Sequence, residues 1–266
     1  MIASVSVVIP CYECEKTIIR AIKSVVAQTV QVAEIILIDD ASKDGTYNLL
    51  CFIQKEYKDK SIKLIKLDTN KGASLARNEG WKVATSDYIA FLDADDSWHP
   101  RKIELQYQWM ISHPSTDLTG HEIGYKNGDG SNASPAIQVN LNCLTITKNK
   151  ILRSNCFSTP TVMVKRDINF RFDNTQYYAE DYLLWLSMIC QGLNAVKLDL
   201  ELAYMYKSPY GEAGLSQNLW AMEKGELEVY QKVYKLGYLR SYQYYFLCIY
   251  SLAKYVRRRV LRIFDV

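Results

Sequence analysis

Residues 88–96 read Tyr-Ile-Ala-Phe-Leu-Asp-Ala-Asp-Asp, an apolar run that ends in three carboxylates within four positions. A short apolar run bounded by polar residues is typical of a buried strand in a parallel sheet. The acids therefore lie at the carboxyl end of the strand. Neighbouring carboxylates repel one another unless they share a cation, so the cluster indicates a divalent metal site. A solvated acidic turn is the alternative, because Asp is also a common turn former.

Three strand-and-helix units precede this strand. The expected elements are strands at 5–10, 34–38 and 62–67 and helices at 15–28, 42–57 and 74–84. Their alternation predicts an α/β fold with a mostly parallel central sheet, flanking helices and right-handed crossovers. Open sheets of this kind bind ligands beyond the carboxyl ends of their strands. We therefore expect one crevice to be lined by the polar clusters at 10–13, 39–40, 70–72 and 93–96.

The second half of the chain has a less regular pattern. Helices are expected at 98–113 and 182–190 and onward from Leu219, strands at 159–164, 195–200 and 202–206, and loops at 124–134 and 209–214. Ser42 is expected to cap the second helix of the first half. Helices thus dominate the C-terminal end of the chain.

Composition and charge exclude several classes of protein. The 266 residues are 48% hydrophobic and 23% charged, as in ordinary globular proteins. The net charge of +3 divides into +5 from residue 240 onward and −2 over residues 1–239, which argues against nucleic-acid binding and for a tail that meets an anionic partner. Seven cysteines without regular spacing predict a reducing, cytoplasmic compartment. Neither a signal peptide nor a membrane-spanning helix is expected.

The C-terminal tail has the pattern of a basic amphipathic helix. Apolar residues share one face and cations another: Ile249, Leu252, Val256, Val260 and Ile263 against Lys254, Arg258 and Arg262. A helix of this kind lies in an anionic membrane interface. The alternative is that the apolar face packs on the domain and the cations are simply solvated.

Two further pairs of residues have chemical potential. Glu180 and Asp181 open a predicted helix, where acids satisfy free backbone amides and favour the helix dipole. The same position keeps Asp181 ionised as a general base for a hydroxyl, and both roles can hold together. Cys11 and Cys14 form a C-x-x-C between a strand and a helix, which is weak support for thiol redox chemistry. P-loop and dinucleotide-binding motifs are missing from the sequence.

Four ordered motifs resemble those of the inverting family 2 glycosyltransferases of the GT-A fold, in particular bacterial enzymes of O-antigen and capsule synthesis. The motifs cover residues 5–12, 38–46, 70–78 and 91–96, and residues 179–185 extend the resemblance. It implies a Rossmann-like nucleotide-diphospho-sugar transferase fold with added C-terminal helices. It also favours a metal-binding role for the acids at 93–96 over a solvated turn.

The resemblance implies roles for individual residues. Pro10, Tyr12 and Asp40 would hold the nucleoside, and Arg77 would lie near the nucleotide. Asp93 and Asp95 match a D-x-D motif, in which Asp95 would bind a Mn2+ or Mg2+ that bridges the diphosphate and Asp93 would contact metal and ribose. Asp96 would face the donor sugar. The rest of the expected donor site is Glu13 and Ala94, although Glu13 departs from the small polar residue usual at its position.

The acceptor side depends on the motif at residues 179–185. Asp181 matches the catalytic base of the family, and Glu180 and Trp185 would contact or support the acceptor. The implied reaction is a single inverting displacement. It moves a hexose from UDP-galactose or UDP-glucose to a hydroxyl of a saccharide acceptor on polyprenyl diphosphate.

The expected organisation is a catalytic domain at 1–215 and a C-terminal helical segment at 216–266. Within the domain, residues 1–100 would bind the nucleotide-sugar and residues 101–215 the acceptor. The helical segment would associate with the inner face of the plasma membrane, so that the protein is peripheral. The rival function is a non-catalytic nucleotide- or carbohydrate-binding protein on the same scaffold.

Overall fold

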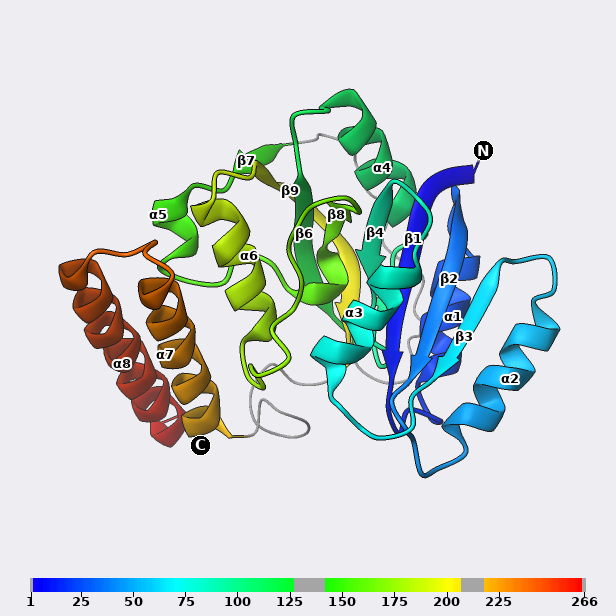
Figure 1. The fold of residues 1–266 in the computed structure, drawn as a ribbon, viewed down its shortest axis with the longest axis horizontal. Coiled ribbons are helices and arrows are strands. Elements are labelled where there is room, and N and C mark those ends of the chain that lie inside the picture. Colours follow the sequence, from blue (N-terminus) through cyan, green and yellow to red (C-terminus); the bar gives the residue numbers. More distant parts are fainter. Residues whose placement is uncertain (1, 127–141, 207–217, 265–266) are drawn as a thin grey trace.

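The computed structural model describes residues 2–126, 142–206 and 218–264. Its strands are β1 (Ile2–Cys11), β2 (Gln31–Asp39), β3 (Ile62–Lys66), β4 (Tyr88–Phe91), β5 (Ser97–Trp98), β6 (Leu118–Tyr125), β7 (Cys143–Thr145), β8 (Met163–Lys165) and β9 (Ala195–Met205). Its α-helices are α1 (Ile18–Val26), α2 (Thr46–Glu56), α3 (Ala73–Val83), α4 (Lys102–Ser112), α5 (Lys148–Ile151), α6 (Glu180–Cys190), α7 (Leu219–Lys235) and α8 (Ser241–Phe264). These elements form one sheet covered by helices (Figure 1).

The sheet has the strand order β3-β2-β1-β4-β8-β6-β9-β5, with β7 paired to β9. Strands β1 to β4 are mutually parallel, as the alternating sequence pattern predicts. Beyond β4 the sheet becomes mixed, because β8 runs antiparallel to both β4 and β6 while β6 and β9 are parallel. The parallel half therefore presents the carboxyl ends of four strands at one edge.

Two hydrophobic cores lie on opposite faces of the sheet. Alternate residues of β1 contribute to each, since successive side chains of a strand point to opposite faces: Val7 and Ile9 pack with α1, α2 and α4, whereas Val8 packs with α3 and α6. Both faces of β1 are thus buried, which explains its unbroken apolar run. Gly80 allows α3 to approach the sheet closely, because an added Cβ would lie 2.6 Å from Val8.

Several element boundaries differ from the sequence-based predictions. The helix expected from Trp98 begins at Lys102, because Ser97 and Trp98 pair with β9 as strand β5. The two strands expected at 195–206 are the single strand β9, and residues 159–161 form a 3₁₀ turn before β8. Of the expected loops, residues 209–214 and most of 124–134 lie outside the described residues.

Ser42 does not cap α2. The helix begins after Gly45, and the Ser42 hydroxyl instead accepts a hydrogen bond of 3.1 Å from the backbone amide of Glu13. The loop that follows β1 takes up this hydroxyl. The same loop also contacts the start of α2, since the Cys14 amide donates a hydrogen bond of 2.9 Å to the Thr46 hydroxyl. The loops after β1 and β2 therefore support one another.

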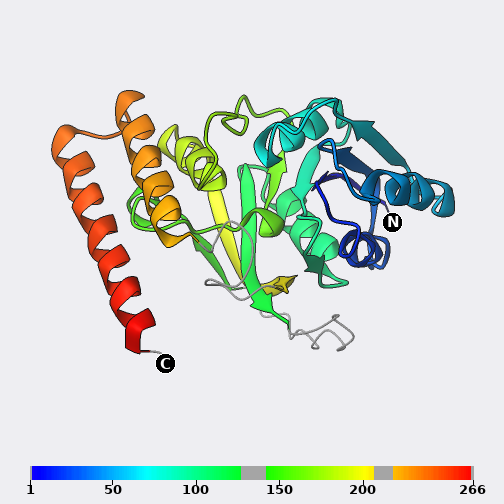
Figure 2. The ribbon, with the colours of Figure 1, turned by 90° about the horizontal axis from the view of Figure 1, so that it is seen from below.

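The C-terminal end is helical, as predicted, and α8 lies at one end of the molecule, opposite α2 (Figure 1). Figure 2 shows α7 between α8 and the rest of the fold. Side chains on α8 are described through Val260, so Arg262 and Ile263 are outside this set. In the described parts of the chain, no helix is long and apolar enough to cross a bilayer.

The orientation of α8 contradicts the alternative in which its apolar face packs on the domain. Ile249, Val256 and Val260 are 69%, 57% and 44% exposed. The inward face carries Lys254 and Arg258, which form ion pairs of 2.7 and 3.0 Å with Glu226 and Glu223 of α7. Two of the three cations named from sequence therefore fasten α8 to α7, and the apolar stripe faces outward.

Candidate active site

The polar clusters after β1, β2 and β3 meet at one edge of the sheet. The carboxylate of Asp40 accepts hydrogen bonds of 2.8 Å from the backbone amides of both Lys71 and Gly72. Gly72 has φ 88°, a left-handed conformation that suits glycine, and it precedes the first turn of α3. Asp40 thus fixes the loop between β3 and α3 next to the loop that follows β2.

Left-handed backbone marks three places in this region. Among the described residues other than glycine, positive φ occurs at Glu13 (45°), Ala41 (55°) and Ala179 (57°). These residues adjoin Tyr12, Asp40 and the Glu180–Asp181 pair. Such conformations cost free energy and gather at functional sites, where the surrounding structure holds them. Backbone strain therefore coincides with three parts of the predicted site.

Tyr12 offers an aromatic surface beside these loops. Its side chain is 44% exposed, although it follows a strand whose last residue, Cys11, is fully buried. A hydrogen bond with Glu13 is the main cause of a phenol pKa above its usual value, and a second partner is Asn70. The ring is therefore available for stacking, the role that the family resemblance implies for a nucleoside contact.

Arg77 joins the two acidic parts of the site. Its guanidinium donates to Asp93 Oδ1 at 2.7 Å and to Glu180 Oε1 at 2.9 Å, while the residue is only 5% exposed. Burial favours a lower pKa for Arg77, but the charges of Asp93 and Glu180 outweigh it and raise the pKa above its usual value. One buried cation from α3 thus holds the end of β4 against the start of α6.

Asp181 lies at the first turn of α6 with its carboxylate half-buried. Its Oδ2 accepts a hydrogen bond of 3.0 Å from Asn155 Nδ2, and its Oδ1 accepts one of 2.6 Å from the Tyr182 amide. Burial, followed by the charge of Glu180, raises the pKa of Asp181 to about 7, against the opposite effects of Tyr182, Arg77 and Asn155. A carboxyl of this pKa can accept a proton near neutral pH.

The acids after β4 form a tight turn. The backbone amide of Asp96 donates to the Asp93 carbonyl at 3.1 Å, and Arg20 Nη2 donates to the Asp95 carbonyl at 2.5 Å. Asp93 and Asp95 carry carboxylate oxygens, the ligand type that Mg2+ and Mn2+ prefer, whereas Asp96 is only 3% exposed. The described residues contain no group of three or more acids, histidines or cysteines that could hold a metal alone. This donor set fits a cation that is completed by substrate phosphates.

The remaining residues predicted for the site have supporting positions. Pro10 is a half-buried member of β1 and Ala94 is 8% exposed within the acidic turn. Trp185 is fully buried, with its ring 6.2 Å from that of Phe91 and 5.7 Å from that of Phe172. It therefore packs α6 against β4 from below the site.

The C-x-x-C motif has the character of a structural pair. Cys11 is fully buried and Cys14 is 7% exposed, and burial is the main cause of a Cys11 pKa well above its usual value. A buried thiol that stays protonated is a poor nucleophile, because thiolate is the reactive form. The position of the motif next to Tyr12 is therefore explained by packing under the loop.

Residues 6–170 match the model of glycosyl transferase family 2. The chain belongs to this family. Two curated relatives are named as bacterial glycosyltransferases. A UDP-Glc:alpha-D-GlcNAc-diphosphoundecaprenol beta-1,3-glucosyltransferase, WfgD of Escherichia coli, is 35% identical over 70% of this chain and 69% of its own. A putative teichuronic acid biosynthesis glycosyltransferase, TuaG of Bacillus subtilis, is 28% identical over 89% of this chain and 91% of its own.

Solved structures place the family 2 chain in the GT-A fold, as predicted. The crystal structure of S. aureus TarS 1-349 aligns with a TM-score of 0.67 at 20% identity, over 93% of this chain and 70% of that one. The match to a longer TarS chain covers 39% of its length. A central sheet with flanking helices and added C-terminal helices is thus established for this transferase.

Sequence reasoning does not single out Asn155 of this family 2 site, and it expects Asp39 to line the crevice as part of the 39–40 cluster, whereas the structure buries it. Asn155 contacts Asp181 from a segment without a recognisable motif, so no sequence signal marks it. Asp39 is fully buried opposite Cys11, and neither of its carboxylate oxygens has a hydrogen-bond partner in the described structure. The Asp39-Asp40 doublet marks this residue in the sequence, because burying a charged side chain at the end of a strand costs free energy unless the charge is paired.

Proposed function

We propose that this chain is a metal-dependent inverting hexosyltransferase that uses a UDP-sugar donor and Asp181 as the general base. One observation carries the proposal: a half-buried carboxyl with a pKa of about 7 opens α6, and Glu180 beside it is joined through Arg77 to Asp93. Arg77 thereby fixes the position of the base relative to the donor-side acids. Membership of glycosyl transferase family 2 supports the reaction class.

The proposed reaction is a single displacement. Asp181 takes the proton of an acceptor hydroxyl as that oxygen attacks the anomeric carbon, and the bond from that carbon to the diphosphate oxygen breaks. Asn155 and the Tyr182 amide each hold one oxygen of the carboxylate, which orients it. Arg77 binds both Glu180 and Asp93, so the proton acceptor on α6 and the donor-site acids after β4 keep a fixed relative position.

The donor would lie across the loops after β1, β2 and β4. Tyr12 and Pro10 would border the nucleoside, the loop fixed by Asp40 would border the base, and Glu13, Ala94 and Asp96 would complete the pocket toward the sugar. Asp95 and Asp93 would hold Mn2+ or Mg2+, which would supply charge stabilisation to the diphosphate. The single acidic turn that carries these residues supports this arrangement.

The substrates are proposed from the relatives. The name of WfgD specifies UDP-glucose as donor and a sugar on diphosphoundecaprenol as acceptor. We infer a UDP-hexose, UDP-glucose or UDP-galactose, and a saccharide on polyprenyl diphosphate in surface-polysaccharide synthesis. Residues 1–215 would form the catalytic domain, with the donor half at 1–100 and the acceptor half at 101–215.

The test is transfer by wild type and by Asp181→Asn from a panel of UDP-sugars to a synthetic GlcNAc-diphospho-lipid. Asp181→Asn keeps the shape but leaves one acceptor oxygen for two donor neighbours and cannot accept the proton, so we expect binding of UDP to persist and transfer to fall by about 10²-fold or more. Substantial transfer by the variant would refute the role of Asp181. Binding of UDP-sugars by wild type with neither transfer nor hydrolysis would favour the non-catalytic alternative.

We further propose that α8, within the C-terminal segment 216–266, rests on an anionic membrane surface, so that the protein is peripheral on the cytoplasmic face. The outward residues with exposed apolar side chains are Tyr242, Tyr245, Phe246, Ile249, Leu252, Val256 and Val260. At 100° per residue these positions share one face, and the exposed Arg257 and Arg259 border it on either side. An apolar stripe edged by cations matches the layers of a lipid interface.

Vesicle binding by the full chain tests this surface. Ile249→Ser/Val256→Ser should weaken binding to vesicles rich in phosphatidylglycerol by at least about tenfold, since two buried apolar side chains are lost. Phe52→Ser is the matched control, because Phe52 is 61% exposed on α2, away from α8. Equal binding by the α8 variant, or a change in oligomeric state in place of vesicle binding, would refute the membrane assignment.

A further inference from the structure

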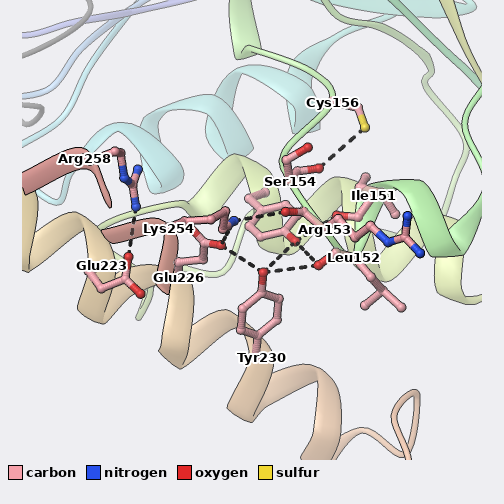
Figure 3. Close-up of polar contacts among 11 residues, drawn as sticks. Ile151, Leu152, Arg153, Ser154, Cys156, Glu223, Glu226, Tyr230, Lys254 and Arg258 are labelled. Carbon is pink, nitrogen blue, oxygen red and sulfur yellow. Dashed lines mark hydrogen bonds and ion pairs between the residues drawn. The ribbon is translucent and has the colours of Figure 1, made fainter. Parts of the chain in front are cut away.

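The inward face of α8 contacts the chain segment that carries Asn155. Lys254 Nζ donates to the backbone carbonyl of Arg153 at 3.0 Å and to Glu226 Oε1 at 2.7 Å (Figure 3). Arg153 precedes by two residues the asparagine that binds Asp181. Helix α8 thus contacts the backbone two residues before the partner of the proposed base, although Lys254 and Arg153 are separated by about a hundred residues in sequence.

The Glu226 carboxylate that binds Lys254 is also linked through Tyr230 to the 151–155 segment. The Tyr230 hydroxyl lies 2.9 Å from Glu226 Oε1 and 3.2 Å from the Leu152 carbonyl (Figure 3). The Tyr182 hydroxyl lies 2.8 Å from the Ile151 carbonyl. Three consecutive carbonyls, of residues 151, 152 and 153, are therefore held by side chains of α6, α7 and α8. The backbone that leads into Asn155 is fixed from three helices.

The amide of Asn155 has a defined orientation at the end of this segment. Its Oδ1 accepts a hydrogen bond of 3.1 Å from the Phe157 amide, which directs Nδ2 toward Asp181 Oδ2 at 3.0 Å. An asparagine held in this way presents a donor to the ionised carboxylate. A small displacement of the segment would lengthen that hydrogen bond, because hydrogen bonds weaken steeply with poor geometry.

We propose that Lys254 is a positioning residue for the base: by binding the Arg153 carbonyl it holds the 151–155 segment so that Asn155 supports Asp181. This inference rests on the proposed role of Asp181. Lys254 does not touch a reacting atom, and its effect passes through Asn155. The helix with the proposed membrane face thereby also contributes to the geometry of the catalytic site.

The chain offers a matched control for loss of helix docking. Arg258 lies one turn beyond Lys254 on the inward face of α8 and pairs with Glu223 of α7 at 3.0 Å (Figure 3). Its described contacts do not include the 151–155 segment. Lys254→Met and Arg258→Met therefore each remove one cation and one α7–α8 ion pair, but only the first removes the bond to Arg153.

The measurement is a carbon-13 NMR titration of the Asp181 carboxyl in the full chain, assigned with Asp181→Asn. Asn155→Ala should raise the titration midpoint of Asp181 by about one pH unit, because a donor to the ionised form is lost. Lys254→Met should raise it by about half a unit or more, whereas Arg258→Met and the conservative Lys254→Arg should leave it close to wild type. Tyr230→Phe is a second route to the same segment should Lys254→Met fold poorly.

The double variant separates positioning from direct charge effects. If Lys254 acts through Asn155, adding Lys254→Met to Asn155→Ala produces no further shift, whereas a direct electrostatic effect would persist. Equal midpoints for Lys254→Met and Arg258→Met, or an undiminished shift in the Asn155→Ala background, would overturn the proposal. Transfer activity in Asp181→Asn would instead overturn the proposed function, so the two failures are distinguishable.

Discussion

Arg77 is predicted to stabilise both the fold and the site through its two ion pairs. Its guanidinium makes two charge-assisted hydrogen bonds, of 2.7 and 2.9 Å, to carboxylates on different elements, and the residue is only 5% exposed. Replacement by methionine fills much of the volume but leaves Asp93 and Glu180 without their counter-ion. Breaking a buried ion pair by removing one partner costs about 3–5 kcal/mol.

We therefore expect Arg77→Met to lower the free energy of unfolding by about 3 kcal/mol or more, measured by urea denaturation of the full chain. Arg101→Met is the matched control, since Arg101 pairs with Glu104 at 2.9 Å on α4 with its side chain 34% exposed. An exposed ion pair contributes about 0.2–1 kcal/mol. Arg77→Lys keeps the charge but lacks the two-pronged geometry, so its loss should be intermediate.

The same substitution has a second readout at Asp181. Arg77 lowers the pKa of Asp181, opposing the larger effects of burial and Glu180. Arg77→Met should accordingly move the titration of Asp181 to higher pH. A loss of stability below about 1 kcal/mol, equal to that of Arg101→Met, would refute the view that Arg77 holds the site together.

Three further predictions concern pH, metal and backbone strain. Transfer should fall as the pH drops below about 7, because Asp181 must be ionised to accept a proton and its pKa is about 7; a pH profile of kcat in wild type that is flat from pH 5 to 8 would contradict this. The raised pKa also means that Asp181 favours folding at low pH, a contribution lost as the pH rises from about 4 to 7, which urea titrations at several pH values can measure. Chelation with EDTA should abolish transfer, added Mn2+ or Mg2+ should restore it, and unchanged turnover in EDTA would exclude the assigned metal. Ala179→Gly should raise the free energy of unfolding by about 0.5–1 kcal/mol by relieving φ 57°, whereas Ala84→Gly, at a residue with φ −66°, should lower it.

The parallel half of the fold could be predicted because its signals are local. Each of β1 to β3 is followed by a helix with its own periodicity, and β4 is an apolar run that ends in the acidic turn, so a short window reveals each element. Strands β5 to β8 are defined by partners distant in sequence: Trp98 pairs with Ala203, and Leu118 pairs with both Val164 and Ala195. No short window contains such a pair, which explains why β6 and β7 were missed and Trp98 was assigned to a helix.

The site divides in the same way. Asp93, Asp95 and Asp181 belong to contiguous motifs and are recognisable from the residues themselves. The Arg77–Glu180 contact spans 103 residues and the Asn155–Asp181 contact joins a segment without a motif, so only the folded chain reveals them. For α8, periodicity identified the apolar face but not its direction. The direction depends on Glu223 and Glu226, acids on another helix that attract Lys254 and Arg258 inward.

The two faces of α8 also bear on how such transferases can be recombined. Its outward residues contact no other part of the described structure closely enough to be buried, so their identities are free to follow the lipid or partner that they meet. Its inward residues are matched to acids of α7 and to the backbone at Arg153. A chimera that exchanges α8 alone would mismatch those charges. An exchange that preserves these contacts would carry the α7–α8 hairpin together with residues 151–155 and Asp173, which forms an ion pair of 2.7 Å with Lys232 of α7.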